Sequence, residues 1–429
     1  MMKTTFPAGF VFGAATSAYQ IEGGWNADGK GESNWDRWSH TPGKIKDGST
    51  ADTACDHYHR FREDVALMRR MGLNGYRFSI AWSRVFPNGD TKLNYRGLDF
   101  YSRLVDELLT AGIQPFTTLC HYDIPQALED QGGWRAREMT DRFADYASAM
   151  GQHLGDRIHH WMTINEPICI ANGHYGGSKE PPGLADPQAA VQVSHHLLLA
   201  HGKAIRALKE TCGSNIRVGL VCNLYPVHGY SGQGQGRSNR VMAKRVGLES
   251  GLESTSGGSS VAENAAAAHL FDGYVNRWYL DPIYKGSYPT DIWEHRGQCI
   301  PQVAEGDMEI IATPPDFLGV NYYHRAVVRA VHKAGRLNYA VVSPAELGRP
   351  FTTMGWEIYP QGLYELLIRL KADYGDPEIY ITENGAAFAD GEPVDGRVHD
   401  RERVAYLQTH LKQVAKCIAD GVRLRGYFV

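Results

Sequence analysis

Two short stretches of this sequence place a glutamate beside an asparagine at the end of a β-rich run. Glu166 lies in TINEPICI (163–170) and Glu383 lies in ITENGAAF (381–388), and Gly or Pro then ends each run. Two carboxyl groups facing one cleft would suit the cleavage of a glycosidic bond, which needs a proton donor for the leaving oxygen and a carboxylate at the anomeric carbon. Other reactions also use carboxylate pairs, and two exposed acids among the 48 Asp and Glu residues are an equally good explanation. The spacing alone leaves these explanations open.

The segments that must position the two glutamates alternate in character. Short β-branched or aromatic runs predict strands, and the longer amphipathic stretches between them predict helices. The predicted strands are residues 10–16, 75–82, 113–120, 159–165, 216–223, 317–323, 378–384 and 423–429. Such alternation implies parallel strands with right-handed crossovers, and eight strands are the number that closes into a (β/α)8 TIM barrel. The alternative is an open doubly wound sheet, which would need a phosphate loop where this chain has YQIEGGW.

The clearest helical patterns lie between these strands and after the seventh. They cover residues 52–72, 94–112, 140–156 and 401–421. In the last of them, apolar residues recur at helical spacing, and we expect them to face the barrel. These residues are Val404, Leu407, Leu411, Val414 and Ile418. Three glycines, Gly72, Gly112 and Gly421, follow helices at the C-cap position before the next strand.

A barrel would bring the two glutamates together. Catalytic groups in parallel barrels come from the C-terminal ends of the strands. Glu166 ends the fourth predicted strand and Glu383 ends the seventh, so both can point into one mouth.

We expect one catalytic domain over residues 1–429, with a Gly/Ser-rich insertion at about 229–260. The insertion contains GQGQG, a weak echo of a dinucleotide-binding fingerprint. It does not join a strand directly to a helix, as that motif must, so a flexible surface insertion is the better interpretation.

Composition narrows the class of partner and the compartment. Lys and Arg number 44 against 48 Asp and Glu, and no basic stripe is present, which argues against nucleic acid. Seven scattered cysteines without a C-x-x-C pair favour a reducing compartment, so we predict a cytoplasmic protein. The N-terminal apolar run is short and broken by Pro7, Gly9 and Gly13, which argues against a signal peptide. No apolar stretch is long enough to span a membrane.

Three histidine pairs raise the question of a metal site. They are His57 with His59, His159 with His160, and His195 with His196. None has the i, i+4 spacing of H-E-x-x-H, so structural or surface roles are expected. We find no sign of a metal or organic cofactor.

Several ordered motifs together identify a family. The chain resembles the family 1 glycoside hydrolases, the β-glucosidase family of retaining (β/α)8 barrels, from residue 6 to residue 429. The resemblance rests on FPAGFVFGAATSAYQIEG (6–23), YRFSIAWSRVFP (76–87), HYDIPQAL (121–128), TINEP (163–167), FLGVNYY (317–323), GWEIYPQGL (355–363) and YITENG (380–385). It implies a retaining β-glycosidase that hydrolyses terminal β-D-glucosyl residues of oligosaccharides or aryl glucosides by double displacement, with a small-molecule β-glycoside as substrate.

The resemblance also implies roles for particular residues. Glu166 would be the acid/base and Glu383 the nucleophile, with Arg77 and Tyr323 supporting the nucleophile. Residues matching those that hold the sugar are Gln20, His121, Asn165 and Asn321. Tyr122 stands where many relatives carry Trp and would keep the aromatic wall. Trp356 matches the platform for the leaving group, although a Trp is more often part of a core.

The likeness ends at RLRGYFV (423–429). In the family, this strand continues into a segment with two Trp and an acidic residue that grip the sugar, followed by a last helix. We therefore expect a C-terminally truncated relative, lacking the end of the eighth strand and the last helix, with exposed apolar surface and weak barrel closure.

Alternative functions follow from that departure. A 6-phospho-β-glycosidase is the close rival, although TSAYQIEG speaks against it. A myrosinase-like enzyme would lack the acid carboxylate, which Glu166 supplies. A sugar-binding barrel without activity, disabled by the truncation, also remains possible on these grounds. Oligomeric state cannot be inferred from the sequence.

Overall fold

The computed structural model describes residues 6–232 and 259–429. Within these ranges, eight parallel strands form a closed barrel in the spatial order β1-β11-β10-β7-β5-β4-β3-β2. The barrel strands are β1 (Val11–Ala15), β2 (Gly75–Ser79), β3 (Gln114–Cys120), β4 (His160–Asn165), β5 (Arg217–Asn223), β7 (Phe317–Asn321), β10 (Ile379–Glu383) and β11 (Leu424–Phe428). Each lies within a predicted strand, so the predicted (β/α)8 barrel is confirmed, and the open doubly wound sheet is wrong.

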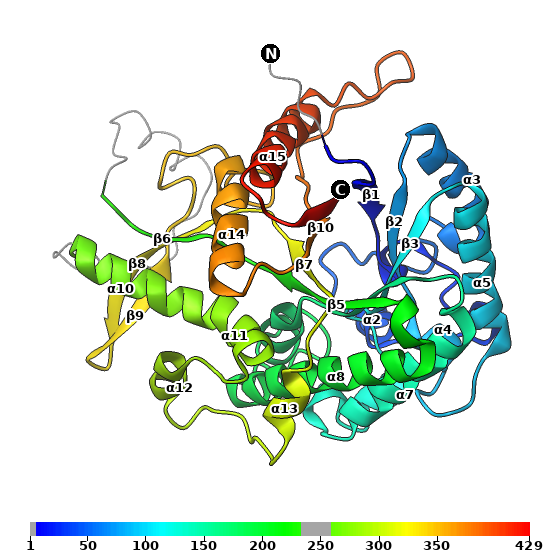
Figure 1. The fold of residues 1–429 in the computed structure, drawn as a ribbon, viewed down its shortest axis with the longest axis horizontal. Coiled ribbons are helices and arrows are strands. Elements are labelled where there is room, and N and C mark those ends of the chain that lie inside the picture. The colour runs from blue at the N-terminus through cyan, green and yellow to red at the C-terminus, as the bar shows by residue number, and fades with distance from the viewer. Residues whose placement is uncertain (1–5, 233–258) are drawn as a thin grey trace.

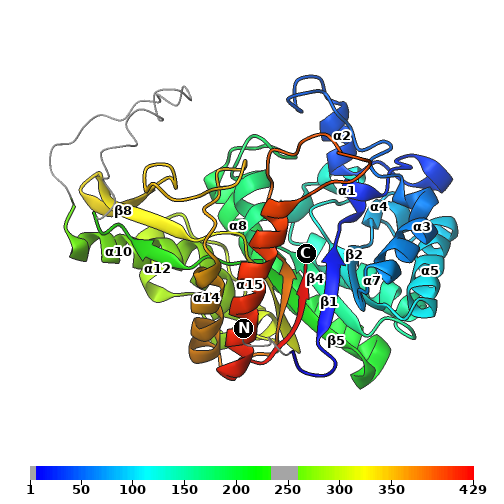
Figure 2. The same ribbon diagram turned by 90° about the horizontal axis from the view of Figure 1, so that it is seen from above.

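Helices surround the barrel. Figure 1 and Figure 2 place α3 and α5 at one side, beside β2 and β3, and α14 and α15 beside β10 and β7. The helices of seven residues or more are α2 (Asn34–His40), α3 (His57–Arg70), α5 (Tyr95–Thr110), α7 (Met139–Leu154), α8 (Pro187–Cys212), α10 (Val261–Asp272), α11 (Trp278–Lys285), α12 (Thr290–Arg296), α14 (Pro360–Asp373) and α15 (Arg401–Ala419). Shorter helices are α1 (Ala18–Ile21), α4 (Trp82–Val85), α6 (Gln126–Glu129) and α13 (Asp307–Ile311). Single turns of other helical types cover Ala27–Gly29, Gly133–Arg135, Cys169–Tyr175, Gly213–Asn215 and Gly273–Arg277.

Apolar side chains fill the barrel interior and the layer between strands and helices. The interior cluster consists of Val11, Phe116, Met162, Val221, Phe317, Tyr380 and Phe428. A larger cluster joins the outer faces of the strands to the helices. This two-layer burial explains why the strands read as nearly continuous apolar runs.

The last strand closes the barrel. β11 pairs in parallel with β1 and with β10, so it is hydrogen-bonded on both sides rather than weakly attached as we expected. The Phe428 ring packs over Gly13, where an added Cβ would lie only 2.3 Å from the ring. Glycine at position 13 therefore makes room for the aromatic side chain that fills this seam.

One helical prediction was wrong in part. The side chain of Val404 in α15 is 53% exposed, whereas Val414 is fully buried and Leu407, Leu411 and Ile418 are half-buried. The buried face also contains Tyr406, His410 and Cys417. The buried stripe of α15 runs through Tyr406, His410, Val414 and Cys417, and Val404 lies to one side of it on the helix surface. The three C-cap glycines do adopt the predicted left-handed conformation, with φ between +74° and +79°.

A second sheet lies outside the barrel. It contains β6 (Val227–Gly229), β8 (Ala326–Lys333) and β9 (Arg336–Val341), and α10 covers it through Ala267 and Ala268. Figure 1 shows this sheet and α10 at the edge opposite α3 and α5. Sequence reasoning missed this β8–β9 hairpin. The insertion predicted at about 229–260 falls mostly on residues 233–258, outside the described part of the chain.

Candidate active site

The two glutamates reach the same end of the barrel from different strands. Glu383 is the last residue of β10, and its Cα pairs in register with Asn321 at the end of β7. Glu166 follows β4 directly, and its N–H donates to the carbonyl of Val221 in β5 at 2.8 Å. Glu166 has φ +45°, a left-handed backbone that few non-glycine residues adopt. The strand ends thus bring two carboxyl groups 217 positions apart in sequence into one cluster, as the sequence predicted for a barrel.

Glu383 is surrounded by donors, one of them charged. Arg77 Nη1 donates to Oε1 at 2.5 Å, and the Tyr323 hydroxyl donates to Oε2 at 2.5 Å. Burial alone would raise the pKa of this carboxyl, but the guanidinium of Arg77 and the hydrogen bond from Tyr323 outweigh it and hold the pKa below its ordinary value. Glu383 is therefore ionised at neutral pH.

Glu166 has only neutral donors around it. Asn321 Nδ2 donates to Oε1 at 2.7 Å, whereas the Tyr122 hydroxyl and the Cys169 thiol both donate to Oε2. Burial raises the pKa of Glu166, the negative charge of Glu383 raises it further, and the three hydrogen bonds offset only part of this. The pKa of the same residue type is thus raised at one position and lowered at the other.

A chain of polar side chains links the two carboxyl groups. Arg77 Nη2 donates to Asn165 Oδ1 at 2.7 Å, and Asn321 Nδ2 donates to the same oxygen at 3.2 Å. Asn165 and Asn321 are both fully buried. Because Arg77 contacts Glu383 and Asn321 contacts Glu166, these two asparagines hold the carboxyl groups in a defined relation.

Other predicted residues line the same region. His121 is buried beside Asn165, and burial lowers the pKa of its ring to about 3, so the ring is neutral. Its Nδ1 has no hydrogen-bond partner among the described residues. A neutral buried ring with a free nitrogen is suited to a sugar hydroxyl.

Gln20 and Trp356 are the remaining two predicted residues of the site. Gln20 is exposed on α1. Trp356 is half-buried, with its ring 5.0 Å from that of Tyr323 and 5.5 Å from that of His324. Tyr323 therefore links the Trp356 side of the mouth to Glu383.

Sequence reasoning missed one member of this cluster. Cys169 begins the helical turn after Glu166, and its Sγ lies 3.1 Å from Glu166 Oε2. The sequence did contain a signal for this contact. Cys169 comes three residues after Glu166, and residues three apart on a helical turn lie on the same face.

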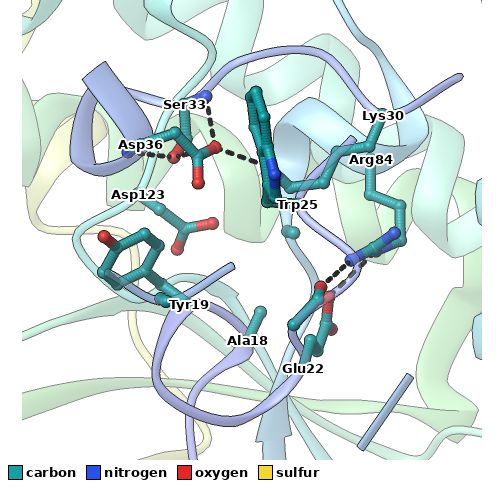
Figure 3. A pocket seen from close by; sticks show the side chains of 12 residues that line it. Ala18, Tyr19, Glu22, Trp25, Lys30, Ser33, Asp36, Arg84 and Asp123 are labelled. Atoms are coloured by element: carbon teal, nitrogen blue, oxygen red, sulfur yellow. Dashed lines mark hydrogen bonds and ion pairs between the residues drawn. The ribbon is translucent and has the colours of Figure 1, made fainter. Parts of the chain in front are cut away.

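A compact group of charged side chains surrounds a small cavity that Asp123 lines. Figure 3 shows Lys30 paired with Asp36 and Arg84 paired with Glu22, at 2.6 Å and 2.9 Å, around a cavity of about 10 Å³. Asp123 also points into it without a cation of its own, and burial, followed by the charge of Glu22, raises its pKa to about 7. The cavity has room for about one water molecule. The Arg84 pair ties the end of α1 to α4, and the Lys30 pair ties the segment after α1 to α2.

The histidine pairs have structural partners. His195 Nε2 lies 3.0 Å from Asp307, and its Nδ1 lies 2.9 Å from the Tyr288 hydroxyl. The His160 ring stacks on Phe116 at 4.3 Å. Within residues 6–232 and 259–429, no group of three or more His, Cys, Asp or Glu side chains could hold a metal ion.

Among the helices of residues 6–232 and 259–429, none combines the length and the apolar character that crossing a membrane requires.

Comparison with known proteins gives a consistent result. The family described as Glycosyl hydrolase family 1 matches residues 2–429. Beta-glucosidase A of Acetivibrio thermocellus is 42% identical over 100% of this chain and 90% of its own length. A 1,4-beta-D-glucan glucohydrolase of Thermotoga neapolitana is also 42% identical, over 99% of this chain and 92% of that protein. The solved structure of a beta-glucosidase from Thermotoga maritima in complex with glucoimidazole superposes with a TM-score of 0.87 at 40% identity, covering 99% of this chain and 89% of that one.

Proposed function

Because the chain belongs to glycosyl hydrolase family 1, we propose that Glu383 is its nucleophile and Glu166 its acid/base in a double displacement. The overall activity is that of a β-glucosidase, the activity named for its relatives. The observation that carries the division of roles is the pair of opposite pKa shifts, lowered at Glu383 by Arg77 and raised at Glu166 by burial and by Glu383.

The first half-reaction breaks the glycosidic bond. Glu383 attacks the anomeric carbon as a carboxylate, and Glu166 gives its proton to the glycosidic oxygen as the bond to the leaving group breaks. A covalent glycosyl-enzyme forms on Glu383, whose negative charge is thereby consumed. Since that charge had helped to raise the pKa of Glu166, the pKa then falls.

The second half-reaction releases the sugar. Glu166, now a carboxylate, takes a proton from water, and the water oxygen attacks the anomeric carbon and displaces Glu383. Two inversions return the β-configuration. Retaining enzymes hold the two carboxyl groups about 5 Å apart.

The sugar of the substrate would meet neutral groups. In this proposal His121, Asn165 and Gln20 hold its hydroxyls, and the ring of Tyr122 forms part of the wall. Neutral donors and acceptors suit hydroxyl groups, which can each donate and accept a hydrogen bond.

We further propose that the leaving group can itself be a sugar, as in cellobiose and short β-glucans, which would place the activity in cellulose degradation. A cavity of about 280 Å³ opens beside Trp356 and His324, lined also by Leu347 and Val341. An aromatic side chain next to a partly apolar cavity can stack on a sugar ring or an aryl group. All seven cysteines are free, which supports the cytoplasm as the compartment.

The test is hydrolysis of 4-nitrophenyl β-D-glucoside by the purified chain, with Glu383→Gly as the blank. We expect turnover by the wild type, with β-glucose as the first product seen by NMR, and a loss of at least about 10⁴-fold in the variant. Full activity in Glu383→Gly would contradict the assignment of the nucleophile. A first product with the α-configuration would contradict double displacement.

A further inference from the structure

Two hydrogen-bond donors meet on one oxygen of Glu166. The Tyr122 hydroxyl and the Cys169 thiol both contact Oε2, whereas Oε1 contacts Asn321. Tyr122 comes from the loop after β3 and Cys169 from the turn after Glu166, so two separate segments converge on the same atom.

The orientation of Asn321 determines which oxygen of Glu166 can carry a proton. Arg77 has only N–H donors, so the Asn165 atom that it contacts must be the amide oxygen. That oxygen in turn requires the Asn321 atom beside it to be the amide nitrogen. The Thr382 hydroxyl, which donates to the other amide atom of Asn321 at 2.7 Å, agrees with this orientation.

An amide nitrogen can donate a hydrogen bond but cannot accept one. Oε1 of Glu166 therefore acts as an acceptor towards Asn321 in both charge states, and the acidic proton belongs on Oε2. The groups that contact Oε2 are a hydroxyl and a thiol, which can each donate or accept.

We propose that Tyr122 and Cys169 hold the acidic proton of Glu166 on Oε2 and set the strength of this acid, with Tyr122 as the main positioning residue. This inference rests on the proposed function, in which Glu166 is the acid/base. When Glu166 is protonated, the Tyr122 hydroxyl accepts from Oε2–H. After the proton has moved to the leaving oxygen, the same hydroxyl turns and donates to the carboxylate, as does the thiol.

The backbone supports a dedicated role for the tyrosine. Tyr122 has φ +77° and Glu166 has φ +45°, so both partners have left-handed backbones that tyrosine and glutamate rarely adopt. Such conformations are energetically unfavourable and persist where the surrounding structure requires them. Here they aim the two side chains at each other.

Charge decides the direction of the effect. A hydrogen bond to a carboxylate is roughly twice as strong as one between neutral groups, so Tyr122 favours the ionised form of Glu166 more than the protonated form. The hydroxyl and the thiol remain protonated donors, because burial and the neighbouring Glu166 raise the pKa of both well above its usual range. Together they partly offset the rise that burial and Glu383 cause at Glu166.

The other titratable groups that face Glu166 come from three strands or the loops after them. They are Glu383 at the end of β10, Tyr323 after β7, and Cys222 and Tyr225 at and after the end of β5. Of these, only Glu383 is charged at neutral pH. Its charge and the hydrogen bonds from Tyr122 and Cys169 to Oε2 are therefore the main contacts that adjust the pKa of the buried Glu166.

The experiment compares the pH dependence of kcat/KM for wild type and Tyr122→Phe, with phenyl β-D-glucoside as substrate because its leaving group needs a proton. In the free enzyme, the alkaline limb reports the loss of the Glu166 proton. Removing the hydroxyl should move this limb up by about 0.5–1 pH unit and leave the acidic limb in place. Cys169→Ala should move it in the same direction by about 0.3 pH unit, since a thiol is a weak donor.

The matched control is Tyr323→Phe, the same deletion at the other carboxyl group. It should move the acidic limb upward and leave the alkaline limb in place. With 2,4-dinitrophenyl β-D-glucoside, whose leaving group needs no proton, the shift caused by Tyr122→Phe should disappear.

An unchanged or lowered alkaline limb in folded Tyr122→Phe would overturn the inference. If that variant does not fold, Cys169→Ser decides instead: its stronger hydroxyl donor should lower the alkaline limb, and an unchanged or raised limb would refute the role of Oε2. Failure of the proposed function looks different. In that case Glu166→Ala would hydrolyse phenyl β-D-glucoside as well as wild type does.

Discussion

Glu166 and Glu383 end two strands of one barrel, yet their surroundings differ in charge. The carboxylate of Glu383 contacts a buried arginine, whereas that of Glu166 contacts an amide, a hydroxyl and a thiol. Burial disfavours the charged form of both, but the Arg77 guanidinium and the Tyr323 hydrogen bond lower the pKa of Glu383, whereas the charge of Glu383 raises that of Glu166. The comparison teaches that the proposed division between acid and nucleophile depends on the placement of Arg77 as well as on the choice of two glutamates.

The largest expected effect comes from removing the acid. Glu166→Ala should lower kcat/KM for cellobiose by about 10³- to 10⁴-fold, because the leaving sugar must be protonated. The glycosylation step with 2,4-dinitrophenyl β-D-glucoside should stay near the wild-type rate, as measured by the burst phase. Azide, which needs no general base, should restore turnover and yield the β-glucosyl azide. If azide rescued neither this variant nor Glu383→Gly, the roles of both carboxyl groups would have to be revised.

Removing the cation should erase much of the difference between the two glutamates. Arg77→Met leaves Glu383 buried without its charged partner, so the pKa of Glu383 should rise. Since attack requires the carboxylate, activity is lost as the pH falls through that pKa, and the acidic limb of kcat/KM should move to higher pH. We expect a loss of about 10²-fold at pH 7, measured with 4-nitrophenyl β-D-glucoside. An acidic limb at its wild-type position would show that Arg77 does not control the ionisation of Glu383.

The smallest effect is one of stability, and its sign should differ between the two positions. In Glu383→Gln, the buried Arg77 loses its counter-charge, which costs about 3 kcal/mol and lowers Tm by about 3 °C. In Glu166→Gln, a group whose pKa is raised in the folded state no longer has to ionise. The raised pKa of Glu166 stabilises the folded state at low pH, and this stabilisation is lost as the pH rises through the folded pKa. Glu166→Gln should therefore raise Tm by about 1 °C at pH 7 and leave it unchanged at pH 4.

Thermal unfolding at the two pH values checks this pair of variants. The folded pKa of Glu383 is lowered, so its stabilising effect is present above the unfolded pKa and is lost as the pH falls through the folded pKa. The penalty for Glu383→Gln should therefore shrink at low pH. Equal shifts of the same sign at both positions would contradict the difference in surroundings on which the comparison rests.

The sequence by itself determined the barrel and the two strand-end glutamates. Apolar residues that recur every two positions predict a strand with one buried face, and a recurrence of 3.6 positions predicts a helix with one buried face. The barrel strands are buried on both faces, so they appear in the sequence as short apolar runs. The same local signal failed at Val404, which keeps the helical period of the apolar residues but lies beside the buried stripe of α15 and is exposed. It also missed the β8–β9 hairpin, whose half-exposed strands pack on a helix distant in sequence.

Only the tertiary structure decided how the glutamates are surrounded. The contacts of Glu166 come from segments near residues 122, 169 and 321, and those of Glu383 from residues 77 and 323. The motifs predicted that most of these residues share a site, but not that Tyr122 reaches Oε2 or that Cys169 joins it there. Those contacts depend on two left-handed backbone residues and on the stagger between strands, which arise when the barrel closes and which no local pattern of residue types encodes.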